Sequence, residues 1–148
     1  MKKYFSFICS ALYACLIFYL CMMQLPEDTP PTFQIPHFDK IVHILMFFGM
    51  TGLLFVEYFN LTQNLTWGQT LGLLLKNKIA DDLRPTSISN VPYYLLGTLS
   101  LLYGGIIEII QENFVSQRLG DWLDFLADAG GVLLALLLFF VAKAHRIK

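Results

Sequence analysis

Charged side chains are scarce in this chain. Only 14% of its 148 residues are Asp, Glu, Lys or Arg, whereas 56% are hydrophobic, a balance outside that of soluble globular proteins. The formal net charge is −1 and the basic residues are scattered along the chain, so we expect no nucleic-acid partner. The composition indicates a membrane protein.

Motifs of the common soluble enzymes are missing. The chain has no GxSxG, P-loop or HExxH sequence, which leaves serine hydrolase, nucleotide-binding and metalloprotease functions without support. Cysteine is rare: Cys9, Cys15 and Cys21 form no CxxC pair, and we interpret them as small apolar helix residues. No recognised zinc or iron spacing joins the candidate ligands His37, Asp39, His43 and Glu108. We therefore expect no cofactor and no bound metal.

Long apolar runs are the abundant feature. Four segments approach the roughly 20 apolar residues that a helix needs to cross a bilayer, namely residues 5–25, 41–59, 92–111 and 122–142. The first follows Lys2-Lys3 like a signal peptide, but its apolar run exceeds the usual signal length, so we expect an uncleaved anchor. The sequence predicts an all-α, polytopic membrane protein with one domain over residues 1–148.

The lysines and arginines predict the orientation, because positively charged flanks stay in the cytoplasm. If both termini are cytoplasmic, only Lys40 and Arg118 among the basic residues fall on the outer side. The same arrangement makes residues 60–91 a cytoplasmic loop and brings most acidic residues to the outer surface. We therefore expect a multi-pass protein with four transmembrane helices and both termini in the cytoplasm.

Polar residues gather around the two outer connections of this topology. On a helix, Asp121 and Asp128 differ by only about 20° in azimuth, and Asp39 lies one turn from His43. An ionised group that faces lipid costs several kcal/mol, so these side chains are expected to face one another. The candidate polar cluster comprises Asp39, Lys40, His43, Glu108, Gln111, Arg118, Asp121, Asp124 and Asp128.

Two interpretations of this cluster stay open. Lys40 and Arg118 neutralise carboxylates in a network that only fixes helix packing, or the deeper carboxylates Glu108 and Asp128 have a function.

Small residues also mark where helices pack closely. The stripe 127–131–135, which reads Ala, Gly and Ala, predicts the close approach of another helix.

The order of these residues resembles a known pattern. It consists of Asp39-Lys40-x-x-His43 at the start of a span, Glu108-x-x-Gln111, and Arg118 followed at six by Asp124 and at thirteen by Gly131. This set is similar to the signature of the VanZ-like family of bacterial membrane proteins, over about Pro36 to Ala142 without the cytoplasmic loop. Two positions depart from that pattern: Asp128 replaces the usual Asn, and Ala135 replaces a Gly.

The resemblance implies a four-helix protein of the bacterial cytoplasmic membrane. The founding member of the family is associated with low-level resistance to the glycopeptide teicoplanin, and no reaction is implied. A polar pocket at the outer leaflet suits a membrane lipid, a lipid-anchored antibiotic or a lipid-linked envelope precursor. The head group of such a molecule meets charges while its tail stays in lipid.

Three classes of function therefore stay open. The first is a cell-envelope protein that binds an amphiphilic ligand or a partner membrane protein, with Lys40 and Arg118 contacting phosphate or carboxylate. The second is a membrane enzyme in which His43 and Glu108 act as acid and base on a lipid-linked substrate. The third is a packing subunit without a ligand, in which the polar network only specifies assembly.

Overall fold

The computed structural model describes residues 7–23, 38–70, 89–114 and 122–145 of the chain. Within these ranges the chain forms four long or medium helices and no strand. They are α1 (Ile8–Met22), α2 (Phe38–Gln63), α5 (Val91–Phe114) and α6 (Trp122–His145). The prediction of an all-α protein is confirmed.

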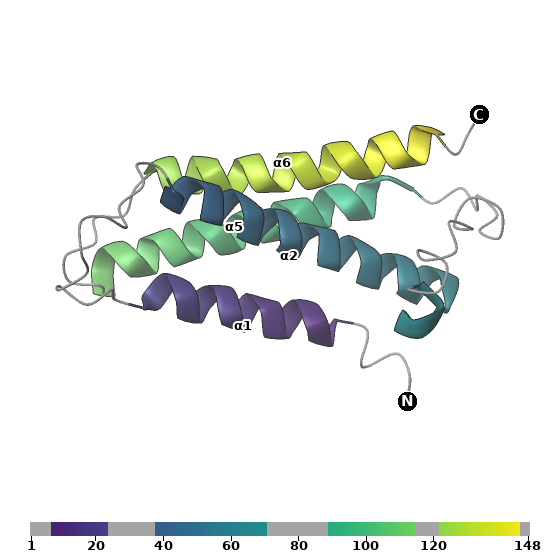
Figure 1. Ribbon diagram of the computed structural model, residues 1–148, viewed down its shortest axis with the longest axis horizontal. Helices are drawn as coiled ribbons and strands as arrows, with labels where there is room; N and C mark the ends of the chain where they lie inside the picture. Colours follow the sequence, from purple (N-terminus) through teal and green to yellow (C-terminus); the bar gives the residue numbers. More distant parts are fainter. Residues whose placement is uncertain (1–6, 24–37, 71–88, 115–121, 146–148) are drawn as a thin grey trace.

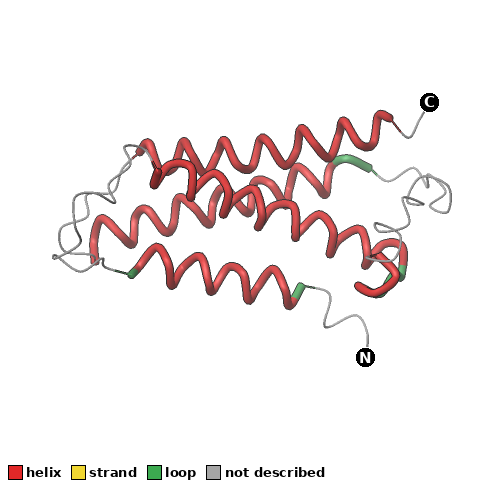
Figure 2. The backbone as a smooth tube through the Cα atoms, in the orientation of Figure 1, coloured by secondary structure: helices red, strands yellow, loops and turns green. Residues whose placement is uncertain are grey.

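The four helices lie side by side and alternate in direction along the chain (Figures 1 and 2). At one end of the bundle α1 and α5 end while α2 and α6 begin. At the other end α1 and α5 begin while α2 and α6 end. Residues far apart in the sequence, near positions 40, 108 and 124, therefore reach the same end of the bundle, which we call the acidic end.

Three of the helices are long and apolar enough to cross a membrane: Phe38–Gln63, Val91–Phe114 and Trp122–Ala144. They support a membrane-embedded protein. Helix α1 has only 15 described residues, about 22 Å at 1.5 Å per residue, whereas the hydrocarbon core is roughly 30 Å thick. The flanks of the first predicted span, residues 5–6 and 24–25, lie outside the described residues. Four spans and cytoplasmic termini thus stay predictions.

The helices extend beyond the apolar runs that predicted them. Helix α2 continues to Gln63, four residues into the predicted cytoplasmic loop, and Asn64 follows with a positive φ of 54°. Asparagine tolerates this left-handed conformation better than most residues, which suits it to the end of a helix. Helix α5 similarly continues to Phe114, three residues past the predicted span. Residues 71–88 of the predicted loop lie outside the described ranges.

Apolar and polar residues are distributed as expected for a protein surrounded by lipid. Large apolar side chains such as Leu12, Leu99 and Leu133 face outward, more than half exposed. Polar side chains lie inside, where Thr51 Oγ1 of α2 donates a hydrogen bond of 2.9 Å to Ser100 Oγ of α5. Lipid does not compete for hydrogen bonds, so polar groups on membrane helices pair with each other between helices.

Helices α2 and α6 form the most extensive contact among the described elements. The contact is closest at Gly131, where an added Cβ would lie 2.3 Å from the Ile44 carbonyl oxygen and 2.8 Å from the Phe48 amide nitrogen. Only a glycine permits two helix backbones to approach this closely. The close approach that the small-residue stripe predicts is therefore confirmed at Gly131.

Aromatic rings fill the end of the bundle opposite the acidic end. Tyr93 of α5 lies against three rings: Phe55 and Tyr58 of α2, with centroids 5.3 Å away, and Phe139 of α6, at 4.0 Å. The T-shaped geometry of the pairs with Phe55 and Tyr58 is a favoured arrangement of aromatic rings. We call this the aromatic end.

Helix α1 is held to α5 by hydrogen bonds at its middle and at its last turn. Tyr103 of α5 donates its hydroxyl to the Ala14 carbonyl oxygen at 2.6 Å, and Gln111 of α5 donates its amide to the Cys21 carbonyl oxygen at 2.7 Å. These bonds reach the middle and the last turn of α1. They fix its position against α5 in addition to apolar packing.

Candidate functional site

An ion pair joins α2 to α6 at the acidic end. The Lys40 ammonium of α2 donates a hydrogen bond to the Asp124 carboxylate of α6. Asp39 Oδ2 lies 3.9 Å from the same ammonium. Lys40 therefore stands between two carboxylates, one on its own helix and one on the facing helix.

A histidine–aspartate pair lies one turn deeper in the same contact. His43 Nδ1 of α2 is 2.9 Å from Asp128 Oδ1 of α6, and both side chains are buried. When Asp128 is ionised and His43 is neutral, the Nδ1–H group of His43 donates the hydrogen bond and Nε2 carries the lone pair. The carboxylate thus fixes both the orientation and the tautomer of the imidazole.

Helix α5 contributes a third group, Glu108. One carboxylate oxygen of Glu108, one ring nitrogen of His43 and one carboxylate oxygen of Asp128 all lie within 4.8 Å of one another. A second set with the same spacing consists of Asp39, His43 and Asp124. His43 belongs to both sets and is therefore the centre of the described cluster.

Two glycines give these side chains their space. Gly131, one turn after Asp128, allows α6 to touch α2 and so brings Asp128 to His43. Gly104, one turn before Glu108 on α5, faces the Asp128 carboxylate. A Cβ there would lie 2.7 Å from Asp128 Oδ2 and 3.0 Å from Phe47 Cε1. Larger residues at these positions would displace the carboxylate.

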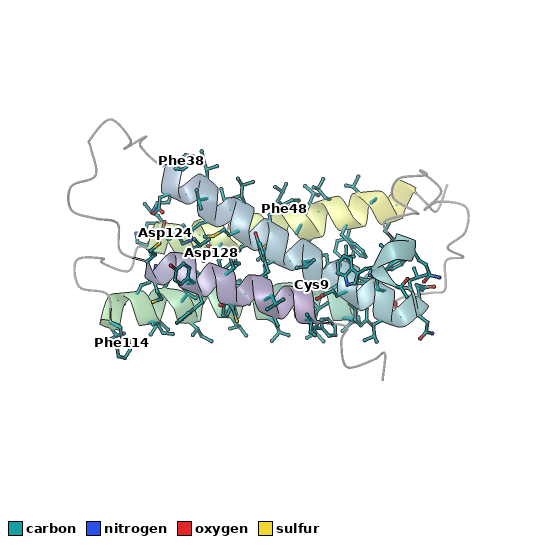
Figure 3. All side chains as sticks on the ribbon, turned by 60° about the horizontal axis from the view of Figure 1, so that its bottom comes forward. Cys9, Phe38, Phe48, Phe114, Asp124 and Asp128 are labelled. Atoms are coloured by element: carbon teal, nitrogen blue, oxygen red, sulfur yellow. The ribbon has the colours of Figure 1, made fainter. Side chains whose placement is uncertain are left out.

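The cluster becomes less accessible from the end of the bundle inward. The exposed fraction of the side chain falls from 51% at Asp39 to 22% at Lys40 and 7% at Asp124, then to 3% at His43 and 1% at Asp128. Figure 3 shows Asp124 and Asp128 toward the end where Phe38 and Phe114 lie, with Cys9 toward the opposite end. The cluster thus has an open side at Asp39 and Lys40 and a closed side at Asp128.

The structure brings together six of the predicted site residues, which are Asp39, Lys40, His43, Glu108, Asp124 and Asp128. Gln111 is turned elsewhere: its amide bonds to α1 at Cys21, as described above. Arg118 and Asp121 lie outside the described residues. Among the described residues this bond is the hydrogen bond found for the Gln111 side chain, and it serves helix packing; the place of Gln111 in the polar cluster stays a prediction.

Glu57 of α2, which the sequence patterns do not predict as a site residue, is among the most buried charged residues. Its carboxylate accepts hydrogen bonds from the backbone amide of Cys9, at 3.0 Å, and from the amide, at 3.3 Å, and hydroxyl of Ser10. These amides belong to the first turn of α1, where Phe7 offers no side-chain cap. A single carboxylate in an otherwise apolar span is the signal that could have indicated such a partner.

Comparison of the chain with protein-family models, with curated proteins and with solved structures gives no match. The resemblance to the VanZ-like family is therefore neither supported nor contradicted and stays a prediction.

Proposed function

We propose that this protein is a multi-pass membrane protein of the cell envelope that binds the polar head group of an amphiphilic ligand, or a partner membrane protein, at its acidic end. The supporting observation is the gradient of accessibility from Asp39 to Asp128. A head group that enters from the membrane surface meets Asp39 and Lys40 first. Its apolar tail then lies along the exposed apolar side chains of the helices.

The two charges at the open side favour a head group that carries both signs. Lys40 offers an ammonium to a phosphate or carboxylate, and Asp39, 3.9 Å away, offers a carboxylate to an amine. The Lys40 ammonium is already bonded to Asp124. An anionic group of the ligand would therefore displace the Asp124 carboxylate from Lys40 or share the ammonium with it. Such a head group is common among membrane phospholipids.

The VanZ-like resemblance adds a more specific proposal: a place in the bacterial cytoplasmic membrane and an effect on teicoplanin susceptibility. Five residues of the pattern that carries the resemblance, Asp39, Lys40, His43, Glu108 and Asp124, lie together in the fold. Expression of the full chain in a susceptible bacterium should raise the minimum inhibitory concentration of teicoplanin. An unchanged concentration at verified membrane expression would remove the link to this antibiotic and leave the binding proposal in place.

The binding proposal is tested by the phospholipid that co-purifies with the full-length protein in mild detergent. The parent should retain about one lipid phosphate per chain, and Lys40→Met should lose it. Lys143→Met is the matched control, because Lys143 bonds to Asn90 at the aromatic end. Absence of lipid phosphate from the parent, or equal retention in Lys40→Met and the parent, would leave a packing subunit as the better interpretation.

A second candidate function is a membrane enzyme that acts on a lipid-linked substrate. The observation that favours it is the bond of 2.9 Å from His43 to Asp128, with Glu108 within 4.8 Å. A carboxylate that orients a histidine leaves Nε2 to accept a proton as a general base, and a nearby protonated carboxyl group can donate its own proton to the leaving group as an acid. His43→Gln and Glu108→Gln should then each abolish product formation in vesicles that contain lipid-linked envelope precursors. Equal turnover in the parent and both variants would exclude this role.

A further inference from the structure

We infer that His43, Glu108 and Asp128 form a binding site for one divalent transition-metal ion. The three side chains come from α2, α5 and α6, and one ligand atom of each lies within 4.8 Å of the other two. One imidazole nitrogen and two carboxylate oxygens form a ligand set that suits Zn²⁺, Fe²⁺ and Mn²⁺. The ion site depends on these three side chains alone, not on the head-group binding proposed above.

The geometry needs little adjustment to hold an ion. Ligand atoms that bind about 2.1 Å from a tetrahedral ion are roughly 3.4 Å from one another. His43 Nδ1 and Asp128 Oδ1 are already 2.9 Å apart, joined by a hydrogen bond whose proton an ion bound to both atoms would replace. Their helices are fixed by the close contact at Gly131. The remaining adjustment falls mainly on Glu108, whose side chain can reach inward by rotation about its flexible bonds.

Electrostatics favours a dication at this depth. Two carboxylates held close together where water is scarce repel each other and are poorly solvated. A divalent cation bound by both carboxylates and a neutral imidazole forms a complex with no net charge, which suits a buried position. Gly104 leaves the room that the Asp128 carboxylate occupies beside α5.

The second set of ligand atoms is less suited to an ion. In that set Asp124 is already bonded to the Lys40 ammonium, and Asp39 is half exposed. A metal ion there would have to displace the ammonium and compete with water. In the deeper set, the side chains of His43 and Asp128 are only 3% and 1% exposed, so water competes less for an ion there, and the ion is assigned to this set.

The test uses the full-length protein in mild detergent, freed of metal by dialysis against a chelator and titrated with Zn²⁺ alone. Equilibrium dialysis with elemental analysis should give one zinc per chain. Glu108→Gln and Asp128→Asn should each weaken zinc binding at least roughly tenfold, since loss of even an outer-shell partner has an effect of that size. Glu112→Gln is the matched control, an exposed acid one turn further along α5, and should bind zinc like the parent.

A second readout separates loss of the site from loss of the fold. Zinc should raise the thermal unfolding midpoint of the parent and of Glu112→Gln, but not that of Glu108→Gln or Asp128→Asn, because only a native-state ligand stabilises by mass action. Circular dichroism checks that each variant is helical. Parent-like binding by Glu108→Gln, an equal loss in Glu112→Gln, or no stoichiometric zinc in the parent would each overturn the inference. So would a loss of binding in Asp39→Asn with binding retained in Glu108→Gln, which would assign the ion to the other set.

Discussion

Gly131 of α6 lies directly against the Ile44 carbonyl of α2, where an added Cβ would be only 2.3 Å from the oxygen. His43 precedes Ile44 in the chain, and Asp128 lies one turn before Gly131. The backbone contact and the histidine–aspartate bond therefore belong to one helix crossing. The close packing determines whether the two ionisable side chains can meet.

Gly131→Ala should lower stability strongly, because the methyl group clashes with backbone atoms that cannot rotate away. Overpacking of a tight interior commonly costs about 1–3 kcal/mol, and a backbone clash belongs at or above the top of this range. Gly130→Ala is the control: within the described part of the chain its Cβ would meet only Ile44 Cγ1, at 3.9 Å, an ordinary contact. Thermal unfolding in detergent should separate the two variants clearly. Similar midpoints for both would mean that α2 and α6 do not cross at Gly131.

The Lys40–Asp124 pair should respond asymmetrically to the loss of its two members. Lys40→Met leaves a buried Asp124 carboxylate without its ammonium, and breaking a buried pair in this way costs about 3–5 kcal/mol. Asp124→Leu should cost less, because the long Lys40 side chain is 22% exposed and can carry its charge to water. The double variant should recover part of the loss in Lys40→Met. Additive losses in this cycle, measured by thermal unfolding, would contradict a direct interaction.

Glu57 should act as the N-terminal cap of α1 although it belongs to α2. Glu57→Gln removes the charge and at least one hydrogen bond to the first turn, a loss of about 1–3 kcal/mol in the attachment of α1. The reactivity of the buried Cys21 thiol reports how firmly α1 is attached, in a variant whose exposed cysteines are removed by Cys9→Ser and Cys15→Ser. Modification of Cys21 by a small maleimide should then accelerate roughly tenfold or more. Ser10→Ala, which loses only the hydroxyl bond, should show a smaller effect.

The predicted topology is tested by reporter fusions. A carboxy-terminal fusion after Lys148 and an insertion at Lys76 should report the cytoplasm, and an insertion between Asn113 and Gln117 should report the outer side. The alternating directions of the helices agree with termini on one side of the membrane (Figure 1). An external carboxy terminus would place the acidic end in the cytoplasm and contradict the proposed access from the outer leaflet.

The helices and most members of the candidate cluster could be predicted from the sequence, because lipid imposes simple rules of length and charge. Which side chains contact one another between the helices could not be predicted. Glu108 and Gln111 are three residues apart and share roughly one face, yet Glu108 faces the cluster and Gln111 bonds to α1. The rotation of a helix about its axis decides between these outcomes, and it depends on packing at glycines such as Gly104. Glu57 was visible as a lone carboxylate in an apolar span, but its partners could not be predicted, because they are backbone amides, which any sequence offers.

The chemical difference between the two ends of the bundle makes the molecule directional. The ionisable side chains around His43 gather at the acidic end, whereas the other end holds the rings around Tyr93 together with Glu57 and Lys143. A copy inserted in the opposite orientation would present Tyr93 and its neighbouring rings at the membrane surface where a correctly inserted copy presents Asp39 and Lys40. In vesicles with random insertion, only one of the two populations would respond to a probe added outside, so activity measured there would have to be normalised to the correctly oriented fraction.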